Sequence, residues 1–174
     1  VIRPAILWCD QRTEKECSYL NEEIGVSKLL ENTGNIALTG FTLPKILWIK
    51  ENEPKNFSEI SKVMLPKDYI VYKLSGVFAT DFSDASGMLL LDVKNRKWSR
   101  EMIEISGLKE ENFPQIYESY EEIGCIKKEF AEELKLNRNI KIIIGGADQA
   151  IGAVGVGAVN SDYISVALGT SGVV

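Results

Sequence analysis

The fold class is indicated most directly by residues 140–149, Ile140-Lys141-Ile142-Ile143-Ile144-Gly145-Gly146-Ala147-Asp148-Gln149. The first five residues are mostly β-branched and apolar, which predicts a buried strand. Two glycines follow, and the small, apolar residues from Ala147 to Val159 predict a closely packed helix. A strand, a tight turn and a helix in this order are typical of α/β proteins, in which ligands bind beyond the carboxyl ends of the strands.

Asp148 therefore lies where α/β proteins often place a site residue, after a strand and at the start of a helix. The helix dipole favours its ionised form, and such a carboxylate can accept the proton of a hydroxyl that attacks a phosphoryl group. The two preceding glycines let another group approach the backbone closely. The alternative is that Asp148 is only the N-cap of the helix, and the residues alone leave both interpretations open.

A second candidate site lies at Gly169, Thr170 and Ser171. These residues follow an apolar segment, 163–168, that predicts a strand. A turn of this composition can present several backbone N–H groups and two hydroxyls to an anion. A plain hairpin turn is the alternative. The sequence contains no Gly-Lys-Ser or Gly-Lys-Thr, which excludes a P-loop.

The composition excludes several classes of chemistry. The 174 residues include no histidine, which rules out Ser-His-Asp and Cys-His catalysis, so a general base would be a carboxylate. The net charge of −5 disfavours a nucleic-acid partner. Three cysteines without a Cys-x-x-Cys pair indicate a reducing compartment, and we expect a cytoplasmic protein. The apolar residues around 142–159 are interrupted by Asp148 and by glycines, so no membrane span is expected.

The composition also changes along the chain. Seven of the 14 glycines lie between Gly145 and Gly172, whereas the first 140 residues are charged and punctuated by prolines. We therefore expect a domain boundary near residues 138–141. In the first part, apolar spacing and turn residues predict helices over 13–24, 26–30, 42–51, 67–74, 100–105 and 128–134, strands over 2–8, 89–93 and 123–126, and a turn over 83–87.

Several segments together resemble the FGGY family of carbohydrate kinases, and within it the xylulokinases most closely. The first family signature corresponds to Gly40-Phe41-Thr42-Leu43-Pro44-Lys45-Ile46-Leu47-Trp48-Ile49-Lys50-Glu51-Asn52. The resemblance covers essentially the whole chain in order and spacing. Its other segments are Trp8-Cys9-Asp10-Gln11-Arg12-Thr13, Thr33-Gly34-Asn35, Leu65-Pro66-Lys67-Asp68-Tyr69, Ser83-Asp84-Ala85-Ser86-Gly87, Gly146-Ala147-Asp148-Gln149-Ala150 and Leu168-Gly169-Thr170-Ser171-Gly172.

The resemblance implies an α/β fold of the actin-like ATPase (ribonuclease H-like) type, with the active site between two domains. Residues 1–140 would be most of the N-terminal sugar-kinase domain, and 141–174 the first strands of the C-terminal, ATP-binding domain. The chain would then be an internal piece, inactive alone, because the phosphate hairpin and adenine pocket of these kinases have no counterpart in it. The unpaired strand edge of such a piece would allow self-association, for example as a homodimer.

The same resemblance implies transfer of the γ-phosphoryl group of ATP, with Mg²⁺, to O5 of D-xylulose. Asp148 would be the catalytic base, Gln149 and Asn35 would bind the sugar, and Gly169, Thr170 and Ser171 would face the ATP phosphates. No metal ligand is expected within this chain. A gluconate or ribulose kinase of the same family is one alternative. A non-catalytic sugar- or nucleotide-binding module of the same fold is another.

Overall fold

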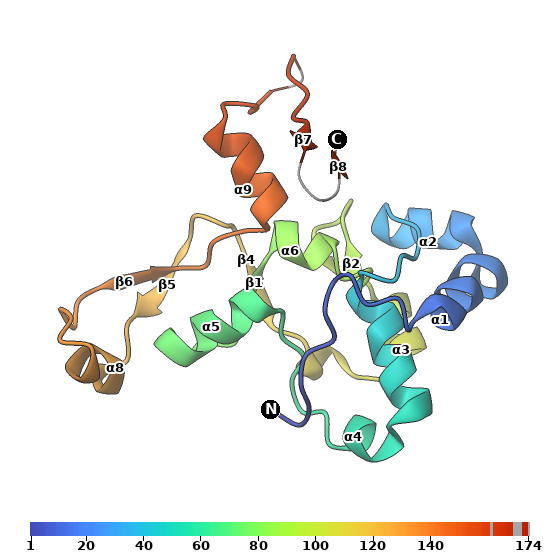
Figure 1. Ribbon diagram of the computed structural model, residues 1–174, viewed down its shortest axis with the longest axis horizontal. Coiled ribbons are helices and arrows are strands. Elements are labelled where there is room, and N and C mark those ends of the chain that lie inside the picture. Colours follow the sequence, from blue (N-terminus) through green and yellow to red (C-terminus); the bar gives the residue numbers. More distant parts are fainter. Residues whose placement is uncertain (161, 169–171, 174) are drawn as a thin grey trace.

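The computed structural model describes residues 1–160, 162–168, 172 and 173. Figure 1 shows the N-terminal helices packed together on one side of the molecule. A two-stranded sheet and a short helix extend on the opposite side, and the helix that begins at Asp148 rises from the centre (Figure 1). The residues that join these parts meet near the middle of the view, where the candidate site lies.

The first half of the chain is helical, as its apolar spacing predicts. Pro44 lies in the first turn of its helix, where the missing N–H costs no hydrogen bond. Gly34 and Gly76 end two of the helices in the left-handed conformation that glycine adopts readily. The elements are α1 (Glu14–Ser18), the π-helical η1 (Tyr19–Gly25), α2 (Val26–Thr33), α3 (Thr42–Asn52), α4 (Pro54–Ser58) and α5 (Pro66–Ser75).

The second half alternates short strands and helices. Strand β1 pairs with β4 in parallel, and the pairs β2–β3, β5–β6 and β7–β8 are antiparallel. The elements are β1 (Ala79–Asp81), α6 (Phe82–Ser86), β2 (Leu91–Asp92), β3 (Lys97–Trp98), α7 (Arg100–Ser106), the 3₁₀ helix η2 (Glu110–Asn112), β4 (Gln115–Tyr117), β5 (Glu122–Cys125), α8 (Lys128–Glu133), β6 (Lys141–Ile143), α9 (Asp148–Gly155), β7 (Ala167–Leu168) and β8 (Gly172–Val173).

Two apolar clusters hold these elements. The larger one packs α2, α3 and α7 together through buried side chains that include Leu29, Leu43 and Met102. The smaller one joins Val71 of α5, Ala79 of β1 and Ile144, which directly follows β6. Burial of Ile144 therefore fixes the start of the segment that leads to α9.

Several predicted elements differ in the structure. Of the strand predicted over 163–168, only Ala167–Leu168 forms, as β7. Residues 2–8 form no strand and Trp8 is exposed, because no described strand lies beside this segment and Pro4 cannot donate a hydrogen bond. The strand predicted over 89–93 is reduced to β2, since Leu89 has a φ of 60°, which a strand does not allow. The strand predicted over 140–144 forms as β6, but it pairs only with β5, so Ile143 is half exposed rather than buried.

The turn predicted over 83–87 is a short helix, α6. It forms because the carboxylate of Asp81, at the N-cap, accepts hydrogen bonds from the backbone N–H groups of Ser83 and Asp84. Helix α6 begins at the C-terminal end of β1, beside the segment that precedes Asp148, and it therefore forms part of the candidate site.

Candidate functional site

Asp148 is the first residue of α9, and its side chain is exposed. Its carboxylate accepts a hydrogen bond from the N–H of Gln149, with 2.8 Å between Oδ1 and N. Ala147, not Asp148, is the N-cap, and the interpretation of Asp148 as a simple helix cap is therefore wrong. Gln149 is also exposed and lies next to Asp148 on the same helical turn.

The segment 145–147 connects β6 to α9 and is held by two serines from different elements. The N–H of Ala147 donates to Ser83 Oγ at 2.9 Å. The N–H of Gly145 donates to the backbone carbonyl of Ser119 at 3.0 Å. Gly146 lies between these two hydrogen bonds. The backbone that carries Asp148 is therefore attached to α6 on one side and to the β4–β5 connection on the other.

Both glycines of this segment are required by its geometry. Gly145 has a φ of +73°, in the left-handed region that favours glycine. A Cβ on Gly146 would lie 2.9 Å from Ser83 Oγ, closer than real Cβ atoms approach such groups, and 3.0 Å from Ser119 Oγ, which is tighter than most real contacts. The two glycines were predicted to let another group approach the backbone closely. In the structure, the groups that approach are the two serines.

The side chain of Asp81 contacts both serines and is fully buried. Its Oδ2 accepts hydrogen bonds from the hydroxyls of Ser83 and of Ser119, the second at 2.7 Å, and from the N–H of Ser83 at 2.9 Å. Burial alone would raise the pKa of Asp81. The hydrogen bonds from Ser83 and Ser119, together with Lys67, outweigh burial and hold its pKa below the ordinary value. Asp81 is therefore ionised at neutral pH.

Lys67 supplies the cation for this buried cluster. Its Nζ lies 3.0 Å from Asp81 Oδ1, 3.1 Å from Asp68 Oδ1 and 3.3 Å from Asp84 Oδ2. These contacts are ion pairs rather than well-aligned hydrogen bonds. Burial lowers the pKa of Lys67, but Asp68 and Asp81 outweigh it and raise the pKa above the ordinary value. Burial raises the pKa values of Asp68 and Asp84.

Sequence reasoning gave Lys67, Asp81 and Ser119 no role in the site. The one local signal was Asp81 two residues before Ser83, a spacing typical of an N-cap before a helix. The contacts with Lys67 and Ser119 carry no such signal, because these residues lie far from Asp81 in the sequence.

Asn35, predicted to bind a sugar, lies at the other end of α6. Its Nδ2 donates to the carbonyls of Thr33 and Ser86, both at 3.4 Å. The same short helix therefore contacts Asn35 at its C-terminal end and Ala147 at its N-terminal end. The structure thus links the predicted sugar-binding residue to the segment that holds Asp148. The predicted phosphate-binding residues Gly169, Thr170 and Ser171 lie outside the described residues.

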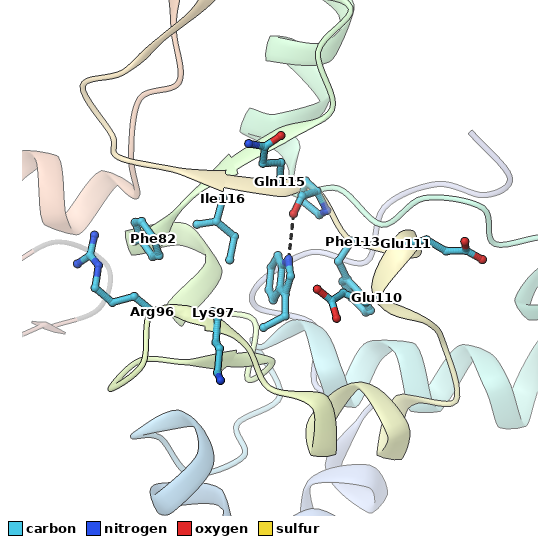
Figure 2. Close-up of a pocket in the computed structure, with 10 residues that line it drawn as sticks. Phe82, Arg96, Lys97, Glu110, Glu111, Phe113, Gln115 and Ile116 are labelled. Atoms are coloured by element: carbon cyan, nitrogen blue, oxygen red, sulfur yellow. Dashed lines mark hydrogen bonds between the residues drawn. The ribbon is translucent and has the colours of Figure 1, made fainter.

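A surface cavity of about 620 Å³ lies on another part of the fold, and Figure 2 shows the side chains that line it. Trp98 forms one wall and donates from Nε1 to the carbonyl of Pro114 at 2.9 Å. Arg96 stacks on the ring of Phe82, with 3.8 Å between its guanidinium carbon and the ring centroid. The lining residues include none of the predicted site residues, so this cavity is not part of the candidate site.

Among the residues that the structure describes, no group of three or more His, Cys, Asp or Glu side chains is placed to hold a metal ion. The three aspartates around Lys67 instead face an ammonium group. None of the helices in the described part of the chain has the length and apolar character needed to cross a bilayer.

Known proteins resemble the chain over nearly its whole length. Xylulose kinase of Lactococcus lactis is 47% identical over 173 residues, which are 99% of this chain and 34% of that protein. Xylulose kinase of Escherichia coli is 43% identical over 99% of this chain and 35% of its own length. The chain therefore spans about a third of the length of the curated relatives it matches.

Solved structures give the same result. A crystal structure described as a "xyloylose kinase" from Brucella ovis superposes with a TM-score of 0.93 at 40% identity, covering 99% of this chain and 35% of that one. Gluconate kinase from Lactobacillus acidophilus has a TM-score of 0.91 at 29% identity and covers 96% of this chain and 34% of that one. These neighbours confirm the predicted fold, a partial actin-like ATPase fold of the sugar-kinase type.

The family comparison covers the segment that holds Asp148. The profile of the "FGGY family of carbohydrate kinases, N-terminal domain" matches residues 1–155, which include β6 and all of α9. The boundary expected near residue 140 stays a prediction. A match over this much of the chain, together with the relatives and structures above, shows that the chain belongs to the FGGY family of carbohydrate kinases.

Proposed function

We propose that the full-length protein containing this chain is an ATP-dependent sugar kinase that converts D-xylulose to D-xylulose 5-phosphate. The observation that carries the proposal is the exposed carboxylate of Asp148, the first residue of α9. The glycine segment that precedes it is fixed by hydrogen bonds. Relatives named xylulose kinase match 99% of the chain and support this substrate.

In the proposed reaction, Asp148 is the general base. It accepts the proton of the O5 hydroxyl while O5 forms a bond to the γ-phosphorus of ATP. The bond from that phosphorus to the oxygen bridging the β and γ phosphates breaks, and ADP leaves. Asp148 is suited to this role because its carboxylate is open to solvent and its one described hydrogen bond lies within its own helical turn.

The remaining groups would bind and orient the substrates. The amides of Gln149 and Asn35 can donate to sugar hydroxyls and accept from them. Gly169, Thr170 and Ser171 would bind the ATP phosphates through backbone N–H groups and hydroxyls. Mg²⁺, when bound with ATP, would neutralise charge that develops on the phosphates. The described residues contain no cluster for that ion, so no step is assigned to it here.

We also propose that the full-length protein works in the cytoplasm and that this chain needs the rest of that protein for activity. The 174-residue chain alone is expected to release no ADP from ATP in the presence of D-xylulose. The full-length protein, measured in the same coupled assay, should release ADP at a readily measured rate. Turnover by the isolated chain would contradict this part of the proposal. Light scattering of the isolated chain would show whether it forms the expected homodimer.

The base assignment is tested by Asp148→Asn in the full-length protein. This change keeps the shape of the side chain but removes its capacity to take a proton, and we expect kcat to fall roughly 10²–10⁴-fold. Binding of the sugar, measured by calorimetry, should change little. Asp92→Asn is the matched control, because among the described residues the Asp92 carboxylate accepts hydrogen bonds only from Asn95, within an exposed turn. Near-normal turnover by the Asp148 variant would refute the assignment of the base. Sugar or nucleotide binding without turnover in the unchanged full-length protein would favour a non-catalytic binding module.

A gluconate kinase is the second candidate, because the solved gluconate kinase from L. acidophilus superposes with a TM-score of 0.91. A panel of D-xylulose, D-ribulose and D-gluconate separates these substrates. We expect the highest kcat/KM with D-xylulose, because the curated relatives with 40–47% identity carry that name. A higher kcat/KM with gluconate would overturn the choice of sugar while leaving the role of Asp148 intact.

A further inference from the structure

Four segments of the chain meet around the buried carboxylate of Asp81, three in direct contact with it and the fourth through two serines. They are α5 through Lys67, the start of α6 through Ser83, the β4–β5 connection through Ser119, and the segment before α9, which the two serines contact. Desolvating a charged group in this way is costly, and such a pair is often no more stabilising than an apolar replacement. The arrangement therefore calls for a reason other than stability.

The two oxygens of Asp81 have separate partners. Oδ1 lies 3.0 Å from the ammonium of Lys67 and 3.4 Å from the N–H of Asp84. Oδ2 accepts the hydroxyls of both serines. Lys67 thus balances the charge from one side, and the other oxygen remains free to orient Ser83 and Ser119.

Each serine also accepts a hydrogen bond from the segment that precedes Asp148. Ser83 donates its hydroxyl proton to Asp81, which turns an oxygen lone pair toward the N–H of Ala147 at 2.9 Å. Ser119 is held by Asp81 through its hydroxyl, and its carbonyl accepts from the N–H of Gly145 at 3.0 Å. A Cβ at position 146 would collide with the Ser83 hydroxyl and crowd the Ser119 hydroxyl. The segment is therefore shaped to fit these two serines.

We propose that Asp81, Ser83 and Ser119 form a clamp, here named the serine clamp, that positions Asp148 for proton transfer. They are positioning residues, because none of them needs to touch the substrate. The inference rests on the proposed function, in which Asp148 is the base. A misplacement of about 1 Å in a reacting group can cost as much as 10²-fold in rate, so a fixed backbone one residue before the base has a direct effect on turnover.

The serine clamp is tested with three variants of the full-length protein. Ser83→Ala removes the acceptor of the Ala147 N–H, and Ser83→Thr retains a hydroxyl at the same position. Ser75→Ala is the matched control. Ser75 is also a half-buried serine, but among the described residues its hydroxyl bonds only to Val71 and Val77, at the end of α5. Each variant is first compared with the unchanged protein by thermal unfolding.

The first measurement is hydrogen exchange of the peptide covering residues 145–150, followed by mass spectrometry. Ser83→Ala should accelerate exchange of one amide, that of Ala147, by about fivefold, the effect of losing one hydrogen bond. Ser83→Thr should restore protection, and Ser75→Ala should leave it unchanged. Unchanged exchange in Ser83→Ala would overturn the clamp, whether or not the protein is a kinase.

The second measurement is steady-state kinetics with the sugar that the full-length protein prefers. Ser83→Ala should lower kcat roughly tenfold and change the KM for the sugar less than twofold, and Ser83→Thr should recover most of kcat. Faster exchange with an unchanged kcat would show that the segment is held but does not position the base, which overturns the proposal. If Ser83→Ala does not fold, Ser119→Ala takes its place. It frees the Ser119 backbone from Asp81, so kcat should fall in the same way, but the amide that exchanges faster should be that of Gly145, which donates to the Ser119 carbonyl. Absence of turnover in the unchanged protein would instead refute the proposed function.

Discussion

Gly146→Ala is the most direct test of how the structure holds Asp148. The substitution adds a single methyl group at the centre of the segment between β6 and α9. Its Cβ would lie 2.9 Å from Ser83 Oγ, 3.0 Å from Ser119 Oγ and 3.0 Å from Ile151 Cδ1. The Ile151 side chain can move away, but both hydroxyls are hydrogen-bonded to Asp81, which is buried and paired with Lys67. The methyl group must therefore displace either the segment or the two serines.

The expected cost follows from these contacts. Overpacking by one methyl group in a well-packed site costs about 1–3 kcal/mol. If one serine rotates away instead, a hydrogen bond to a charged group is lost, which costs about 1.5–3 kcal/mol. Either route gives a loss of about 2 kcal/mol in the free energy of unfolding. Displacement of the segment also moves Asp148, so kcat should fall at least tenfold.

The assay is urea unfolding together with steady-state kinetics of the full-length protein. Gly87→Ala is the matched control, since Gly87 ends α6 with a φ of −77°, and its Cβ would meet only the carbonyl of Asp84 at an ordinary 3.5 Å. We expect the control to unfold at the normal urea concentration and to retain its kcat. If Gly146→Ala behaved like Gly87→Ala in both measurements, the close contact with the serines would not exist in the folded protein, and the reasoning would be refuted.

Three further predictions concern the same region. Lys67→Met leaves buried carboxylates without a cation, so the free energy of unfolding should fall by about 3 kcal/mol, and an unchanged urea midpoint would contradict the ion-pair geometry. Asp81 has a lowered pKa, so its stabilisation is present above the ordinary value of 3.8 and is lost as pH falls through the lower folded value. Asp81→Asn should therefore cost most near neutral pH and progressively less as pH is lowered below 3.8, as urea unfolding over this pH range would show. Asn35→Ala should raise the KM for the sugar with little effect on kcat, whereas a large fall in kcat alone would exclude a simple binding role.

The sequence predicts most helices correctly because their signals are local. Pro44, Gly34 and Gly76 mark helix starts and ends through their own backbone preferences, and Ser99 caps α7 within its first turn. The strands are predicted less well, since a strand needs a partner that the sequence does not identify. Residues 2–8 have the apolar composition of a strand but lie beside none in the described part of the chain.

The residues of the candidate site, too, were predictable only where their signals are local. Asp148 and the two glycines before it could be found from the sequence, because the strand, the turn and the helix are adjacent there. Asp81 could not be found, since the contacts that define it come from residues far along the chain: Ser119 is 38 residues away, and the bond from Ala147 to Ser83 spans 64 residues. The glycines indicate only that some group approaches the backbone. The structure shows that the group is a pair of serines held by a buried charge. Asp81 orients the Ser83 hydroxyl toward the N–H of Ala147 and holds Ser119, whose carbonyl accepts from the N–H of Gly145. These bonds limit how the backbone can move, as apolar packing of the same volume would not, because hydrogen bonds depend on direction and dispersion contacts hardly do.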